Sequence, residues 1–155
     1  MNTHQGTAST RRTARAVVLE RPEVLALRQL DLDPAGEHDL VIDIEYSGIS
    51  TGTEKLLWNG RMPVFPGMGY PLVPGYESVG RVVDAGEGAQ HLVGQRVFVP
   101  GARCYGEVRG LFGGASSRLE SAESRVVTVD ESLGERAVLL ALAATAYHEI
   151  GRAHV

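Results

Sequence analysis

Two short polar segments hold the residues best suited to catalysis. The first, Ser47–Glu54, contains four hydroxyl groups and a carboxylate, and the second, Tyr76-Glu77, adds a phenol and another carboxylate. Hydroxyl groups relay a proton and carboxylates accept one, so the two segments together have the chemistry of a general base. By composition alone, the first segment is instead a helix N-cap in which Thr51 or Thr53 satisfies free N–H groups. Tyr76-Glu77 is equally typical of the start of a strand or of an acid and a phenol in a cleft.

Other candidate motifs are weaker. Gly86-Glu87-Gly88 begins like a dinucleotide fingerprint, but His91 replaces the third glycine and a strand follows where a helix is needed. We therefore predict a hairpin turn there. None of the five histidines stands at metal-ligand spacing with Cys, Asp or Glu. Cys104 is the sole cysteine, which excludes a disulfide framework and a Cys-rich zinc site, and we expect it to be a buried small side chain.

Composition narrows the class of protein. The 155 residues carry a formal charge of −4 and are 43% hydrophobic, which is ordinary globular composition. Mild acidity without a basic stripe argues against a nucleic-acid partner. The longest apolar run, Ala137–Ala144, is too short to span a bilayer, which needs about 20 residues. We predict a cytoplasmic protein with no membrane span and, over residues 1–15, a disordered tail, with a transit peptide as the alternative.

Glycine and period-two patterns indicate a mainly β fold with short helices. Sixteen of the 19 glycines lie between Gly36 and Gly114, where they serve tight turns. Leu40–Tyr46 alternates, with Val41 and Asp43 on one face and Ile42, Ile44 and Tyr46 on the other, as in a half-buried strand. Further strands are expected at 16–20 and 24–30 (a hairpin), 79–83, 96–99, 115–119 and 125–129.

Three other elements complete the pattern. Thr51–Trp58 predicts a short helix that ends at Asn59-Gly60. Arg61–Pro74 contains four prolines and two glycines, so we expect an irregular loop, although an unusually apolar one. Ser132 and Glu135 have capping-box spacing before a helix that is apolar on all sides, and such a helix needs neighbours all around it.

Four segments in this order resemble the medium-chain dehydrogenase/reductase superfamily: GISTGTEKL, PLVPGYESVGRVVDAG, VGQRVFV and LAATAYH. The resemblance covers about Ala16 to His148. It implies a GroES-like β-barrel catalytic domain over residues 16–130 and a helix over 131–148 that leads towards an absent Rossmann domain. It also implies an NAD-dependent alcohol dehydrogenase, of which this chain would be an inactive N-terminal fragment. A homodimer of the full-length protein is compatible with it.

The departures from the superfamily pattern concern zinc. Zinc-dependent members carry Cys where this chain has Ser50, and His where it has Tyr76, and the third ligand position falls near Ala141. Neither Ser nor Tyr is a usual zinc ligand. The resemblance, read with these departures, implies a zinc-independent member with no metal site.

The resemblance also implies roles for individual residues. Thr53 matches the proton-relay hydroxyl, with Ser50, Thr51 and Tyr76 as further hydroxyls and Glu77 or Glu54 as the proton acceptor. Thr145 matches the threonine that lies against the nicotinamide. The loop between positions 58 and 70 is similar to that of members that oxidise the 1-hydroxyethyl group of a bacteriochlorophyllide to acetyl. We expect its side chains to form one wall of that substrate's site, or else merely to pack the loop down: Trp58, Met62, Phe65, Met68 and Tyr70.

Two alternatives and one anomaly remain. The chain could belong to another reductase of the superfamily that acts on a quinone or small carbonyl, or be a GroES-like binding module without enzyme activity. The superfamily pattern stops at Tyr147-His148, and the last residues, 149–155, end in the peptide that a common sequencing adapter encodes in one reading frame. We expect residues 149–155 to be non-native.

Overall fold

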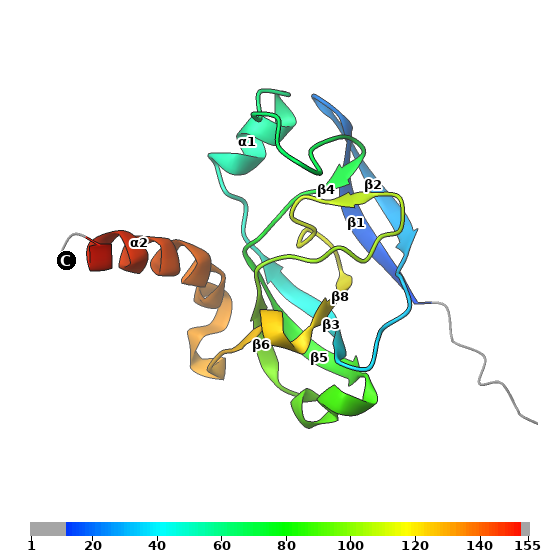
Figure 1. Cartoon of the computed structure of the whole chain (residues 1–155), viewed down its shortest axis with the longest axis vertical. Helices are drawn as coiled ribbons and strands as arrows, with labels where there is room; N and C mark the ends of the chain where they lie inside the picture. The colour runs from blue at the N-terminus through cyan, green and yellow to red at the C-terminus, as the bar shows by residue number, and fades with distance from the viewer. Residues whose placement is uncertain (1–11, 153–155) are drawn as a thin grey trace, which may run out of the picture.

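The structure, a computed structural model, describes residues 12–152 and consists mainly of two β-sheets with short helices (Figure 1). The first sheet has the order β2-β1-β4-β7 and the second the order β8-β3-β5-β6-β9. The strands are β1 (Thr13–Arg21), β2 (Val24–Asp31), β3 (Asp39–Ser47), β4 (Leu72–Val73), β5 (Ser78–Ala85), β6 (Arg96–Val99), β7 (Arg109–Gly110), β8 (Arg118–Ala122) and β9 (Val127–Thr128). The mainly β fold class is therefore confirmed.

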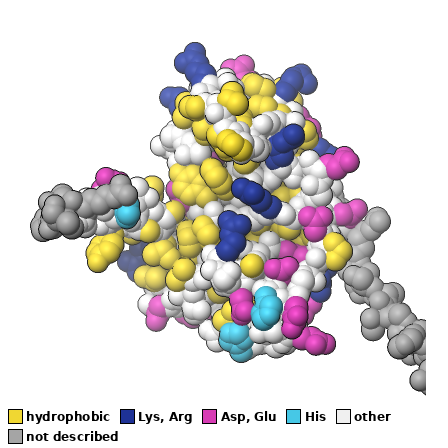
Figure 2. Space-filling view, in the orientation of Figure 1, with side chains coloured by type: hydrophobic (Ala, Val, Ile, Leu, Met, Phe, Trp, Pro, Cys, Tyr) yellow, Lys and Arg dark blue, Asp and Glu magenta, His cyan; other side chains and the backbone are white. Residues whose placement is uncertain are grey.

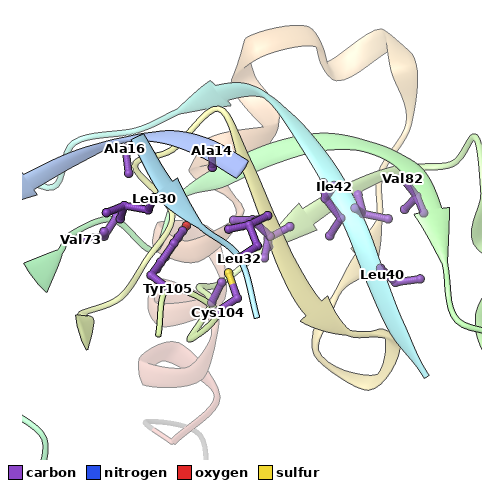
Figure 3. Close-up of a cluster of buried hydrophobic side chains, with 14 of the residues drawn as sticks. Ala14, Ala16, Leu30, Leu32, Leu40, Ile42, Val73, Val82, Cys104 and Tyr105 are labelled. Carbon is purple, nitrogen blue, oxygen red and sulfur yellow. The ribbon is translucent and has the colours of Figure 1, made fainter. Parts of the chain in front are cut away.

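The two sheets enclose the larger hydrophobic core (Figure 3). Strand β1 contributes Ala14, Ala16 and Val18, which alternate with more exposed residues, as a strand with one buried face requires. Strand β3 contributes Leu40 and Ile42, both 0% exposed. Cys104 is buried in this core as expected, and burial raises the pKa of its thiol to about 12.

Backbone hydrogen bonds also link the sheets to each other. Val17 donates to the Ala115 carbonyl at 2.9 Å, and Ser117 donates to the Arg15 carbonyl at 2.8 Å. Because residues 115–117 bond to β1 in this way, β8 begins only at Arg118, three residues later than the predicted strand. The strands remain two open sheets and do not form the closed barrel that the resemblance implied, since β4 and β7 pair over only two residues each.

Several predicted element boundaries need correction. Strand β1 begins at Thr13, inside the predicted tail, and the other residues of that tail, 1–11, lie outside the described part. The turn between β5 and β6 contains a 3-10 helix, η1 (Glu87–Leu92), and β5 and β6 pair antiparallel as the predicted hairpin requires. The loop from 61 to 74 includes β4 near its end, a strand that was not predicted because the four prolines of this segment indicated an irregular loop.

The C-terminal helical region differs from its prediction in its cap. After a short 3-10 turn, η2 (Glu123–Arg125), the 3-10 helix η3 (Glu131–Leu139) is capped by Asp130, whose side chain accepts from the Ser132 N–H at 2.8 Å. The capping box of Ser132 and Glu135 is therefore wrong. Helix α2 (Leu140–Arg152) follows, so four residues of the predicted non-native tail continue this helix, while 153–155 lie outside the described residues.

Helix α2 projects from the β body with much of its surface uncovered (Figure 1). Leu142, Tyr147 and Ile150 are 51%, 81% and 64% exposed. The neighbours that this apolar helix was expected to need are thus not supplied by the part of the chain that the structure describes. No helix within residues 12–152 is long and apolar enough to cross a membrane.

The fold predicts that alanine substitutions at two glycines near the site differ in their effect on stability. Gly75 has φ +98°, and a Cβ there would lie 2.9 Å from the Ala115 nitrogen, whereas Gly52 has φ −82° and open space around it. Gly75→Ala should lower the unfolding free energy by about 1–3 kcal/mol because of backbone strain, while Gly52→Ala should lower it by less than about 0.5 kcal/mol or raise it. Urea unfolding of both variants measures this difference, and equal stabilities would contradict it.

Candidate active site

The site begins where β3 ends beside the start of β5. Ser47 pairs with Ser78, and the next residue, Gly48, donates its N–H to the Glu77 carbonyl at 2.8 Å. A Cβ on Gly48 would lie only 2.4 Å from Glu77 Oε2, so a residue with a side chain would displace this carboxylate. The chain then turns away from the sheet towards helix α1 (Thr53–Trp58). This close approach brings the two polar segments of the sequence together.

Two hydroxyl groups of those segments form a hydrogen-bonded pair. Thr53 Oγ1 lies 3.3 Å from the phenol oxygen of Tyr76, and either atom can be the donor. Ser50 lies one turn earlier, and its Oγ accepts from the Thr53 backbone N–H at 3.4 Å. The N-cap position of α1 is Gly52, so Ser50 satisfies the helix N–H that Thr51 or Thr53 was expected to satisfy. The Thr51 side chain is exposed to solvent.

Two carboxylates with unsatisfied oxygens follow the paired hydroxyl residues directly in the chain, Glu54 after Thr53 and Glu77 after Tyr76. Glu77 is only 4% exposed, and its Oε1 has no hydrogen-bond partner among the described residues. Both carboxylate oxygens of Glu54 are also buried without such a partner. Burial raises the pKa of Glu54, and the nearby Glu77 carboxylate raises it further. Glu54 is therefore disposed to accept and hold a proton.

The hydroxyl pair opens onto an apolar cleft of about 490 Å³. Apart from Thr53 and Tyr76, its lining is hydrophobic: Leu56, Met62, Phe65, Pro100 and Phe112. The Tyr76 and Phe112 rings meet edge to face, with centroids 5.6 Å apart. Such a volume lies within the range of about 300–1,000 Å³ for small-molecule sites, and a few polar groups in an apolar lining are typical of them.

The structure divides the five residues predicted to form the substrate wall. Met62 and Phe65 line the cleft. Met68 and Tyr70 do not line the cleft. Like Met62 and Phe65, they pack against a second buried cluster, which consists of Leu19, Leu57, Leu72 and Leu111. Tyr70 also donates its hydroxyl to the Leu57 carbonyl. Trp58 is 40% exposed and does not line the cleft. The loop thus both packs down and lines the cleft with Met62 and Phe65, and a substrate role for any of the five residues stays a prediction.

Three cleft residues had no signal as site residues in the sequence. Leu56 is part of an ordinary helical pattern, and Pro100 merely follows a strand. Phe112 belongs to the glycine-rich segment 101–114, where its aromatic ring was the one available clue. Their place in the cleft depends on long-range packing, which local patterns do not encode.

Thr145 lies apart from the cleft, on the exposed length of α2. Its hydroxyl donates to the Ala141 carbonyl at 3.0 Å, within the helix itself. The position of Thr145 relative to a nucleotide therefore depends on residues other than those described, and its cofactor role stays a prediction.

The donor set of the cleft does not suit a zinc ion. At the positions where zinc ligands were sought, the chain presents the Ser50 hydroxyl, the Tyr76 phenol and the apolar Ala141, whereas zinc prefers thiolate, imidazole and carboxylate ligands. Within residues 12–152, no three His, Cys, Asp or Glu side chains are grouped so that they could hold a metal ion.

Comparison with known proteins identifies the family. Residues 36–139 match the family model of the alcohol dehydrogenase GroES-like domain, which is more than half of the chain. The chain belongs to this family.

Two curated relatives share much of the sequence. A 2-desacetyl-2-hydroxyethyl bacteriochlorophyllide A dehydrogenase from Rhodobacter capsulatus is 56% identical over 135 residues, which are 86% of this chain and 43% of the relative. A protein of the same name from Cereibacter sphaeroides is 50% identical over 146 residues, covering 90% of this chain and 46% of the relative. The chain thus spans less than half the length of these relatives.

Solved structures agree on the fold. A 2R,3R-butanediol dehydrogenase from Bacillus subtilis matches with a TM-score of 0.65 and 22% identity, over 81% of this chain and 43% of that one. An alcohol dehydrogenase from Escherichia coli in complex with NADH matches with a TM-score of 0.66 and 22% identity, over 82% of this chain and 42% of that one. At this level of identity the likeness establishes the GroES-like fold.

The raised pKa of Glu54 predicts a pH-dependent effect on stability. An acid whose pKa is raised in the folded state costs nothing at pH values below its unfolded pKa, where it is protonated in both states. Its burial penalty grows as the pH rises through the folded pKa, because the buried group must then ionise. Glu54→Gln should therefore raise the Tm relative to the unmodified protein at about pH 8, and raise it less at about pH 4.

Thermal unfolding at the two pH values tests this expectation. Glu107→Gln, which changes an exposed glutamate, is the matched control and should shift the Tm little at either pH. A Glu54→Gln effect that is the same at both pH values would show that the carboxylate's ionisation is not the cause.

Proposed function

We propose that this chain is the N-terminal part of an NAD-dependent, zinc-independent alcohol dehydrogenase that oxidises the 1-hydroxyethyl group of a bacteriochlorophyllide to acetyl. The observation that carries the proposal is the Thr53–Tyr76 hydroxyl pair, which is the polar end of an otherwise apolar cleft. The 56% and 50% identity to relatives named for this substrate supports the choice of alcohol. A large, flat and apolar ring suits a lining of Met, Phe and Leu side chains.

Oxidation of the alcohol removes a proton from oxygen and a hydride from carbon. We assign the proton to the residues of this chain. With the substrate hydroxyl at the polar end of the cleft, Thr53 and Tyr76 accept its hydrogen bond and pass the proton through their own 3.3 Å contact. Ser50 holds the first turn of α1 and so keeps Thr53 in place.

The proton acceptor in this scheme is one of the two buried carboxylates that follow the hydroxyl residues in the chain, Glu54 and Glu77. Glu54 accepts the proton because burial and the charge of Glu77 both raise its pKa. A carboxylate whose pKa is raised is a stronger base than the carboxylate of an exposed glutamate. Its burial also keeps competing water away. Glu77 contributes its negative charge, held in place against Gly48.

A nicotinamide cofactor would accept the hydride when bound. Two of the solved structures with this fold contain such cofactors, NADP in one and NADH in the other. In this chain only Thr145 is a candidate to touch the nicotinamide, and the sequence contains no dinucleotide fingerprint. We therefore propose that α2 leads into a nucleotide-binding domain of the full-length protein, and that the 155 residues alone are inactive.

The full-length protein should reduce NAD when supplied with the 1-hydroxyethyl bacteriochlorophyllide and form the acetyl product. Absorbance at the nicotinamide band and chromatography of the pigment measure the two products, which should appear in equal amounts. Treatment with a metal chelator should leave the rate unchanged, since no residue of the cleft is a suitable zinc ligand. A protein that oxidises only small alcohols would contradict the proposed substrate, and loss of rate with zinc removal would contradict zinc independence.

Thr53→Val should lower kcat by about a hundredfold with little change in KM, because it removes the relay hydroxyl and keeps the side-chain shape. Steady-state kinetics of the full-length enzyme measure both parameters. Thr128→Val, which removes an exposed hydroxyl from β9, is the control and should retain the unmodified kcat. Full activity of Thr53→Val would remove Thr53 from the mechanism.

A further inference from the structure

A second hollow lies next to the cleft and has a basic lining. It has a volume of about 440 Å³ and is lined by Arg103 and Arg109 together with mostly small or apolar residues: Pro66, Gly67, Gly106, Val108, Gly110 and Leu111. No carboxylate of residues 12–152 lines it, although the chain as a whole carries a charge of −4. This basic hollow is therefore a local concentration of positive charge on an acidic protein, and such a hollow favours an anionic group.

The cleft and the basic hollow share two stretches of chain. Phe65 lines the cleft, and the next residues, Pro66 and Gly67, line the basic hollow. In the same way Phe112 lines the cleft and Leu111 lines the basic hollow. The two spaces are therefore lined by consecutive residues of the same two stretches of chain, whose Cα atoms are about 3.8 Å apart. Figure 2 likewise shows basic side chains beside hydrophobic ones at the middle of the visible face.

The two arginines have donors to spare. Arg109 donates one Nη1 bond to the Tyr70 carbonyl at 3.2 Å, and its guanidinium lies over Gly69, where a Cβ would come within 3.2 Å of Cζ. One bond leaves most of its five N–H donors free. Within residues 12–152 the Arg103 side chain makes no ion pair or hydrogen bond. It also borders a third hollow lined by Asp33, Asp39 and Glu120, but pairs with none of them.

We propose that Arg103 and Arg109 bind a carboxylate of the same substrate whose hydroxyl group faces Thr53 and Tyr76, so that the substrate spans both spaces. This rests on the proposed function, because a bacteriochlorophyllide carries its propionate side chain as a free acid on a different part of the ring from the hydroxyethyl group. A guanidinium binds a carboxylate through two parallel N–H donors, which fixes orientation as well as adding affinity. At Gly67 no atom lies within 4 Å of where a Cβ would stand, which leaves room for the group to approach.

The test compares the substrate as its free acid with the same compound as its methyl ester, which lacks the negative charge. The dissociation constant of each from the full-length protein is measured by the change in pigment absorbance, and turnover with NAD is measured separately. Arg103→Gln and Arg109→Gln should each weaken binding of the free acid about fivefold, and the double variant more, while binding of the ester stays unchanged. Arg21→Gln, which changes an exposed arginine at the end of β1, should affect neither.

The outcomes separate the inference from the function on which it rests. The carboxylate site is wrong if the arginine variants bind the free acid as tightly as the unmodified protein does. It is also wrong if the variants bind the free acid and the ester more weakly by the same factor, even when the enzyme turns over. If the unmodified protein binds both forms and oxidises neither, the proposed activity fails, and the free-acid comparison still decides the carboxylate site. If it binds neither form, both proposals are overturned.

Discussion

The contact between Gly48 and Glu77 determines where the polar groups of the cleft lie. The end of β3 and the start of β5 approach so closely that only a hydrogen atom fits at Gly48 beside the Glu77 carboxylate. The backbones of β3 and β5 are just as close at Gly80, where a Cβ would lie 2.2 Å from the Asp43 carbonyl oxygen. Because both strands are fixed in this way, the residues that follow Gly48 and precede Glu77 must meet. The Thr53–Tyr76 bond is a consequence of that meeting.

The loop between α1 and β4 combines two roles that the sequence presented as alternatives. Its Met and aromatic side chains cover the leucine cluster, which gives the loop a fixed shape despite its prolines. A loop held in this way presents Phe65 and Met62 to the cleft without a large loss of side-chain entropy when a ligand binds. Packing therefore fixes the side chains that line the cleft, and the two arrangements do not compete.

The sequence predicted the elements whose signals are local. The alternation over Leu40–Tyr46 predicted β3, because the buried side chains of a strand with one buried face recur every two residues. The two apolar runs on either side of Pro22 predicted the β1–β2 hairpin. The sequence missed β4 and β7, because β4 pairs with β1 only at Leu72–Leu19 and with β7 over two residues, and these partners lie far away along the chain. It also placed a capping box at Ser132, because residue types alone did not show that Asp130 already accepts the N–H bond there. Of the site, it found the polar residues, whereas Pro100 and Phe112 depend on tertiary packing.

The charged side chains around the cleft and the basic hollow favour one orientation of a bound ring. The Glu54 and Glu77 carboxylates are buried next to the hydroxyl residues in the chain, whereas Arg103 and Arg109 line the basic hollow. An apolar ring alone could enter in several orientations with nearly equal energy, because hydrophobic contact is not directional. A carboxylate on that ring would be repelled by the buried glutamates and attracted by the two arginines of the basic hollow. Binding of the carboxylate in the basic hollow would thus leave the alcohol, and not another substituent, for Thr53 and Tyr76.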